Sequence, residues 1–290
     1  MTRPVLLLGH AGVLGGAERS LLDAVPALAP ASAMLFADGP LRAALEARGI
    51  PTVVHAMRDI GRVRKETRRP TVRALRDAWR LAGVVAAHAA PDAILYANSQ
   101  KAFVIAALSV LRRRRPLIWH LRDLLGAPHF STLNARAVTW LANRCATRVI
   151  VNSHAAGDAF VASGGRAALV RVVHNGIDAA PFVSAQPSRD ATRRALGVDG
   201  RWVIATVGRI APWKGQQVVI DALSRLPGDV HALIIGAPLF GEDAFAEALV
   251  AQANDGIDLA RIGGGPLRDL MMVGGPVAAW SARMSASSPA

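Results

Sequence analysis

The chain has 290 residues, 52% of them hydrophobic, and its 34 Lys and Arg against 21 Asp and Glu give a formal net charge of +13. This composition is typical of a globular protein with one large or two medium domains. The single cysteine, Cys145, excludes a disulfide framework and any cysteine-based metal site, and we expect a reducing, cytoplasmic compartment.

Short apolar runs typical of buried strands alternate along the chain with Ala- and Leu-rich runs at helical spacing. In chain order the pattern predicts strands at 4–10, 32–37, 51–56, 92–99, 116–121, 148–153 and 168–176. Helices are predicted between them at 17–28, 41–49, 71–88, 101–111, 134–146 and 154–164. Such alternation predicts an α/β fold with a mostly parallel, doubly wound sheet.

A break in this pattern divides the chain. The segment 179–195 contains Pro, Ser and Arg without a strand pattern, and we expect a linker there. Beyond it the alternation resumes, with strands at 202–208 and 230–236 and helices at 215–226 and 242–254. The predicted domains are therefore 1–180 and a partial second domain, 181–261, in which a third strand could begin near Gly256. Residues 262–290 show neither the period of a strand nor that of a helix, and we expect an irregular tail there.

Two apolar runs are too short to serve as membrane segments. The first twelve residues contain too few apolar positions for a signal sequence or a span. The run "AFVIAALSVLRRRR" (102–115) has about half of the ~20 apolar residues that a span needs before its four arginines. The favoured interpretation is a helix that packs in the core and is followed by the four arginines.

Basic residues concentrate at 58–80 and 112–115. A basic surface attracts phosphates, anionic lipid or nucleic acid, and the alternative is a solvated face without a ligand. The chain has one tyrosine, so no aromatic platform accompanies the clusters. This argues against single-strand and RNA-recognition modules, and we expect no nucleic-acid partner.

A glycine-rich turn follows the first predicted strand. In "GHAGVLGGAERS" (9–20) Gly15 and Gly16 lack Cβ atoms, so backbone N–H groups can approach a ligand closely at the start of the next helix. The spacing is not that of the dinucleotide fingerprint G-x-G-x-x-G. The alternative is a tight turn with a purely structural role.

Two further candidates follow predicted strands of the first domain. His120 lies at the carboxyl end of strand 116–121, the edge where open α/β sheets bind ligands, and an imidazole there can bond a sugar hydroxyl or a phosphate. The alternative for His120 is a core histidine with a structural role. The alternative for Arg122 and Asp123 beside it is a pair on the surface. Asn175 and Gly176 mark a turn that could equally be an ordinary one.

The stretch "GRIAPWKG" (208–215) places two cations just past strand 203–208, again at the ligand edge. It is not a P-loop, which needs G-x-x-x-x-G-K-[ST]. The Arg209 guanidinium can bind a diphosphate bidentately and Lys214 adds a point charge, an arrangement that would stabilise a departing phosphate. The alternative is a pair of surface cations on a loop.

Together these stretches resemble the retaining glycosyltransferases of family 4, which have the GT-B fold of two doubly wound domains. The matching motifs run in the family's order: "GGAE" after the first strand, a histidine after a middle strand, "NGID" at the end of the first domain, and "GR-x-x-x-x-KG" in the second. In this chain they are Gly15 to Glu18, His120, Asn175 to Asp178, and Gly208 to Gly215.

The resemblance implies a nucleotide-sugar donor, no cofactor and no metal ion. Arg209 and Lys214 would hold the donor diphosphate, His120 would contact the sugar or the transition state, and Gly16 would lie near the acceptor. The remaining donor- or acceptor-binding candidates are Gly15, Glu18, Asn175, Gly176 and Gly208. Family members act on lipid-linked or polysaccharide acceptors, many at the inner membrane face. We therefore expect a cytoplasmic protein with peripheral contact to an anionic membrane.

One departure from the family concerns the donor carboxylates. The family carries a late E-x₇-E pair that contacts the sugar and the ribose, whereas no Glu follows Glu247 here. Glu242 and Glu247 are five apart and earlier, so the motif is not assigned to them. We expect an out-of-frame or otherwise truncated end from residue 262 and weak transfer. The alternatives are a non-catalytic protein that binds a membrane surface or an anionic ligand, and a phosphate-handling α/β enzyme unrelated to sugars.

Overall fold

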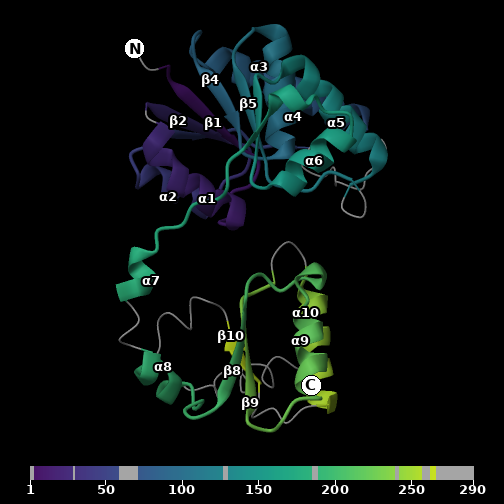
Figure 1. Cartoon of the computed structure of the whole chain (residues 1–290). Helices are drawn as coiled ribbons and strands as arrows, with labels where there is room; N and C mark the ends of the chain where they lie inside the picture. Colours follow the sequence, from purple (N-terminus) through teal and green to yellow (C-terminus); the bar gives the residue numbers. More distant parts are fainter. Residues whose placement is uncertain are drawn as a thin grey trace, which may run out of the picture. The chain divides into compact units, whose positions relative to one another are not determined.

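The computed structural model describes residues 3–28, 30–58, 71–126, 130–184, 189–238, 242–256 and 262–265. The chain divides into two compact units, Met1–Ile177 and Asp178–Ala290. Each unit contains a parallel sheet with helices packed against it (Figure 1).

The first unit is built on a seven-stranded sheet in the order β3-β2-β1-β4-β5-β6-β7. Its strands are β1 (Val5–Gly9), β2 (Ala31–Leu35), β3 (Thr52–Val54), β4 (Ile94–Ala97), β5 (Leu117–Leu121), β6 (Arg148–Val151) and β7 (Val170–Val172). Every neighbouring pair is parallel, which confirms the predicted doubly wound α/β fold. The strand order reverses between β1 and β4, where such sheets leave a crevice for ligands at their carboxyl ends.

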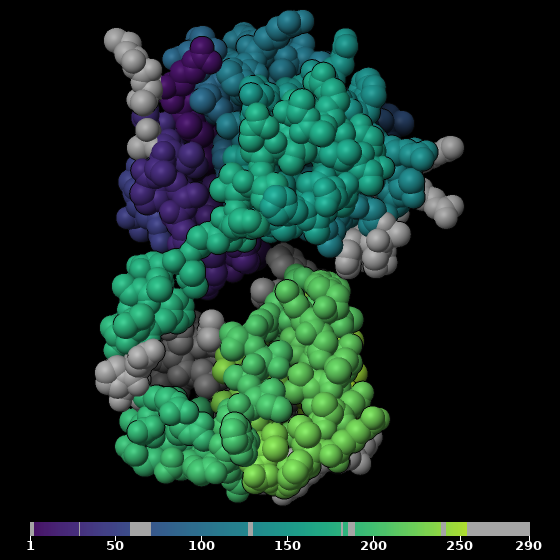
Figure 2. Space-filling model, viewed as in Figure 1, coloured from purple at the N-terminus to yellow at the C-terminus, as the bar shows by residue number. Residues whose placement is uncertain are grey.

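Helices cover both faces of this sheet. On one face are α1 (Gly16–Ala24) and α2 (Pro40–Glu46), and on the other α3 (Val72–His88), α4 (Gln100–Arg112), α5 (Thr132–Cys145) and α6 (His154–Ala162). In Figure 2 the side chains of α3 to α6, coloured blue to teal, cover their face of the first unit. The predicted core helix in 102–115 is α4, with Phe103, Ile105 and Ala106 fully buried. Within the ranges described, no helix is long and apolar enough to cross a membrane.

Strand β5 shows how the alternation of side chains positions the site. Leu117, Trp119 and Leu121 enter the larger core, where the Trp119 ring stacks on Phe103 with 4.3 Å between ring centroids. The intervening residues face the other side of the sheet, where His120 meets Tyr96. A well-packed apolar face therefore lies directly behind His120.

The second unit contains a three-stranded parallel sheet in the order β10-β9-β8. Its strands are β8 (Trp202–Val207), β9 (Val230–Ile235) and β10 (Ile262–Gly265), and its helices are α7 (Ala180–Ser184), α8 (Arg189–Ala195), α9 (Gln216–Leu223) and α10 (Asp243–Gly256). The core forms where α9 and α10 pack on β9, around Ile220, Ile234 and Leu249.

Two sequence expectations for this unit were wrong in part. The segment 179–195, predicted as a linker, contains α7 and α8. In α8, Asp190 in the first turn and Arg193 and Arg194 in the last suit the helix dipole. Residues 262–265, assigned to the irregular tail, form β10, because pairing with β9 uses backbone groups that a glycine-rich run supplies without any side-chain pattern. The rest of the expected tail lies outside the described residues.

Candidate functional site

Polar side chains from four segments meet at the carboxyl edge of the first unit's sheet. They come from the start of α1, from the residue after β4, from the end of β5 and from the turn after β7. The set consists of Glu18, Ser20, Asn98, His120, Arg122 and Asn175. This edge includes the β1/β4 reversal, where a doubly wound sheet binds ligands.

Arg122 joins these segments. Its Nε donates to Asn98 Oδ1 and its Nη1 to Asn175 Oδ1, each at 3.2 Å, while its Nη2 lies 3.2 Å from His120 Nδ1. Asn175 Oδ1 also accepts from Ser20 Oγ at 3.2 Å, which ties the turn after β7 to α1. Arg122 is half-buried and central to the cluster rather than a surface residue. This role of Arg122 was not predicted from the sequence, although the position of Arg122 after β5 and next to His120 was an available signal.

His120 is buried, with 7% of its surface exposed. Tyr96 Oη lies 2.5 Å from its Nδ1. Burial, and secondly the charge of Arg122, lower the pKa of His120 to about 4, so the imidazole is neutral at pH 7. Its Nε2 is buried without a hydrogen-bond partner among the described residues. A histidine with a purely structural role in the core would have both ring nitrogens hydrogen-bonded, whereas Nε2 of His120 has no partner among the described residues.

His120 is expected to make the first unit less stable as pH falls from 6.5 towards 4. In that window the unfolded chain binds a proton at this imidazole and the native chain does not, because the native pKa is about 4. Above pH 6.5 neither state binds this proton, so the free energy of unfolding has its full value there. By pH 5 the proton bound to the unfolded chain lowers the free energy of unfolding by about 2 kcal/mol. Urea unfolding at pH 7 and pH 5, followed by hydrogen exchange of β5 peptides, should show this loss in the wild type and not in His120→Gln. Equal losses in both would contradict it.

Glu18 and the two glycines form the start of α1. Gly15 is the N-cap and Glu18 the third helical residue, as in a capping box. Burial raises the pKa of Glu18, whereas hydrogen bonds from the backbone at Glu18 and Gly15 and the charge of Arg122 oppose that rise. A Cβ at Gly15 would lie 2.9 Å from Glu18 Oε2, but a Cβ at Gly16 would meet nothing within 4 Å. Gly15 is thus packed within the turn, and Gly16 borders open space.

In the second unit, Arg209 follows β8 and Lys214 ends a short 3₁₀ helix, Pro212–Lys214, with its side chain exposed. The Arg209 guanidinium lies over the Trp213 ring, 4.9 Å from its centroid, and its Nε is 3.4 Å from Glu242 Oε2. Gly215 has φ +75°, a left-handed conformation that favours glycine, and is the N-cap residue of α9. In the ranges described, no three His, Cys, Asp or Glu residues are placed to hold a metal ion.

The backbone around Arg209 is held by its neighbours. Gly208 N donates to Ile235 O at 2.9 Å, and Gln216 Nε2 donates to Arg209 O at 2.9 Å. A Cβ at Gly236 would lie 1.8 Å from Gly208 O, so the ends of β8 and β9 approach as closely as glycine allows. Neither Gln216 nor a role for Glu242 was predicted from the sequence. Both are polar residues that only the folded unit brings to Arg209.

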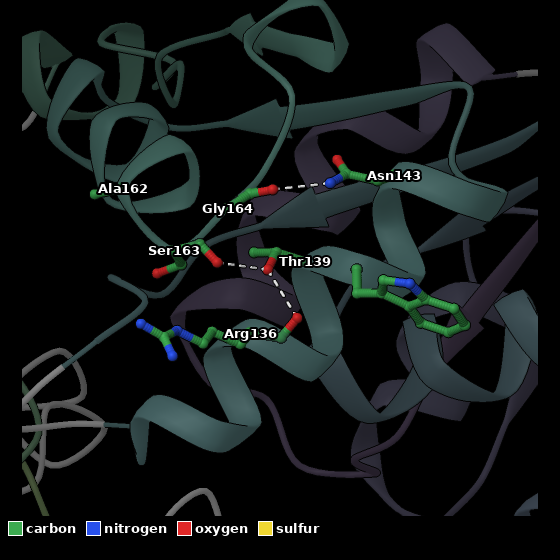
Figure 3. A pocket seen from close by; sticks show the side chains of 7 residues that line it. Arg136, Thr139, Asn143, Ala162, Ser163 and Gly164 are labelled. Atoms are coloured by element: carbon green, nitrogen blue, oxygen red, sulfur yellow. Dashed lines mark hydrogen bonds between the residues drawn. The ribbon is translucent and has the colours of Figure 1, made fainter.

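A surface hollow of about 340 Å³ lies between α5 and the end of α6 (Figure 3). Its polar groups bond to one another: Thr139 Oγ1 donates to Ser163 O at 2.8 Å, and Asn143 Nδ2 donates to Gly164 O at 2.8 Å. Its lining comes from α5 between Arg136 and Asn143 and from residues 162–164 at the end of α6, and it shares no residue with the cluster around His120. It is therefore not part of the candidate site.

The comparison with known families decides the assignment. The model of Glycosyltransferase Family 4 matches residues 14–180, more than half of the chain. The chain belongs to this family. Its fold is similar to that of Anabaena Alr3699/HepE, whose crystal structure is in complex with UDP-glucose, with 34% identity over 93% of this chain and 70% of that chain and a TM-score of 0.79. The predicted family and GT-B fold are confirmed.

Two further relatives extend the comparison. A glycosyltransferase from Rickettsia africae shares the fold at 14% identity, with a TM-score of 0.68 over 91% of this chain and 68% of that chain. The D-inositol 3-phosphate glycosyltransferase of Mycobacterium sp. (strain KMS) is 37% identical over 112 residues, which make up 38% of this chain and 25% of that protein. The match thus spans about a quarter of the length of this curated relative.

Proposed function

We propose that this family 4 chain transfers a sugar from a nucleoside-diphosphate donor to a glycan or lipid-linked acceptor with retention. The observation that carries the proposal is the placement of Arg209 and Lys214 in the segment that connects β8 to α9, where a diphosphate can meet a guanidinium fork and an ammonium group. Uridine diphosphate sugars are the first donors to test, because Alr3699/HepE was crystallised with UDP-glucose.

Each candidate residue has a proposed role in this reaction. Arg209 and Lys214 hold the diphosphate and stabilise its charge as the bond to the sugar breaks, so no metal ion or cofactor is required. His120 donates its Nε2–H to an oxygen of the sugar. The open space beside Gly16 admits the acceptor. Gly15 and Glu18 after β1, Asn175 and Gly176 after β7, and Gly208 after β8 shape the three turns that contact the ligands.

For residues 1–290 alone we propose slow transfer, because no Glu follows Glu247 to supply the family's E-x₇-E pair. The test is calorimetric titration with UDP, GDP and their glucose, galactose and mannose derivatives, followed by assays of nucleotide release. Binding of a diphosphate with slow release supports the proposal. Fast turnover would contradict slow transfer, and no binding of any diphosphate at millimolar concentration would refute the donor site.

A peripheral membrane contact is proposed for the exposed face of α3 and the end of α4. Val72, Leu75 and Trp79 lie three and four residues apart on α3 and are 73%, 54% and 49% exposed. Leu111 of α4 is also exposed, and the Arg112 guanidinium lies 4.0 Å from the Trp79 ring centroid. Arg73 and Arg76 on α3, and Arg113 and Arg114 just after α4, are also exposed. Apolar side chains bordered by cations suit the interface of an anionic bilayer, as on the cytoplasmic leaflet.

Replacing Leu75 and Trp79 by alanine is expected to weaken binding to phosphatidylglycerol vesicles about tenfold, because two apolar side chains leave the lipid interface. Vesicle co-sedimentation measures the effect, with phosphatidylcholine vesicles showing the dependence on charge. Trp140→Ala is the matched control, since Trp140 is an exposed tryptophan on α5 of the same unit. An equal loss in Trp140→Ala would contradict this face. Vesicle binding without any nucleotide binding would favour a non-catalytic membrane-surface protein.

A further inference from the structure

Two groups approach the same ring nitrogen of His120. Tyr96 Oη lies 2.5 Å from Nδ1, and Arg122 Nη2 lies 3.2 Å from it. The other nitrogen, Nε2, is buried and has no partner among the described residues. The ring is 7% exposed, so solvent does not readily supply the missing bond.

The position of Arg122 determines which ring nitrogen of His120 carries the proton. A guanidinium can only donate hydrogen bonds. Its fork is held in place because Nε donates to Asn98 and Nη1 to Asn175. A proton on His120 Nδ1 would therefore face an N–H group that cannot turn away. Nδ1 must accept, and the Tyr96 hydroxyl, which can donate or accept, donates to it.

We propose that Tyr96 and Arg122 are positioning residues that hold His120 as the neutral Nε2–H tautomer, with this N–H directed to a substrate oxygen. His120 then acts as a hydrogen-bond donor and not as a general base. The tautomer follows from the geometry alone. The identity of the oxygen, a hydroxyl of the transferred sugar, rests on the proposed function.

This arrangement has a consequence for specificity. A buried N–H without an acceptor is unfavourable, so the site favours a ligand that places an oxygen at Nε2 and disfavours one that lacks it. Tyr96 does not touch the ligand in this scheme. Its removal should weaken the contribution of the sugar to binding and leave the contribution of the nucleotide unchanged.

Long-range ¹H–¹⁵N correlation spectra of the labelled chain test the tautomer directly, with the His120 signals assigned through His120→Gln. The expected result at pH 7 is a single form with the proton on Nε2. Arg122→Gln should bring in the Nδ1–H form, whereas Tyr96→Phe leaves the Arg122 donor in place and should keep the proton on Nε2 while the ring loses one of its two contacts at Nδ1. Ser109→Ala, which removes a buried hydroxyl from α4, should leave the spectrum unchanged. A proton on Nδ1 in the wild type, or an unchanged tautomer in Arg122→Gln, would overturn the proposal.

Binding measurements separate this inference from the proposed function. The affinity for UDP-glucose relative to UDP is expected to fall about tenfold in Tyr96→Phe, while the affinity for UDP itself is retained. An unchanged ratio would overturn the positioning role of Tyr96. A wild-type chain that binds neither ligand would refute the donor assignment, and the spectra would still decide the tautomer.

Discussion

Arg209→Ala is expected to weaken the binding of UDP about 100-fold and to leave the binding of uridine nearly unchanged. The guanidinium lies beyond β8 with its Nε near Glu242 and one face over Trp213. Hydrogen bonds to a charged group contribute about 1.5 to 3 kcal/mol each, so the loss of a bidentate pair reaches this magnitude. Calorimetric titration with the two ligands separates the diphosphate contribution from that of the base and ribose.

Three variants show whether the effect belongs to phosphate recognition. Arg209→Lys keeps the charge and loses the fork, so an intermediate affinity for UDP is expected. Arg225→Ala removes an exposed arginine from the same unit and serves as the control. If Arg209 served only to neutralise Glu242, then Arg209→Ala and Glu242→Gln would both lower the melting temperature without changing the affinity for UDP. That outcome would remove Arg209 from the proposed donor site.

The fold of the first unit follows from local patterns, and β5 shows why. Leu117, Trp119 and Leu121 repeat every second residue, and the helical runs on either side bury one face each. The rule that ligands bind at the carboxyl ends of parallel strands then singles out His120 and Arg209. These inferences need only the period of each segment and the position at which the strand ends.

The partners of those residues were not predictable in the same way. Tyr96 and Asn98 are 24 residues from His120 and Arg122, and Ser20 is 155 residues from Asn175. No period relates such positions, because their contacts arise from strand order and from how α1 sits on the sheet. The glycines of β10 are a second case, since their strand is defined by backbone pairing with β9 and not by side chains.

Trp119→Ala is expected to destabilise the first unit by about 3 to 5 kcal/mol, the range for truncating a large aromatic side chain in a core. Trp119 has no exposed surface, stacks on Phe103 and meets Phe160 edge-on with 6.2 Å between ring centroids. Urea unfolding followed by hydrogen exchange of β5 peptides measures the loss. Trp140→Ala, at a 64% exposed position, should change stability by less than about 0.5 kcal/mol.

Trp119→Phe distinguishes lost packing from lost hydrogen bonding. The Trp119 Nε1–H is buried without a partner among the described residues, so phenylalanine removes an unsatisfied donor while it keeps a ring against Phe103. A loss of about 1 kcal/mol is therefore expected, well below that of alanine. A loss as large as that of Trp119→Ala would mean that the indole makes a bond essential to the core. Because side chains alternate along β5, Trp119→Phe should also leave the tautomer of His120 unchanged.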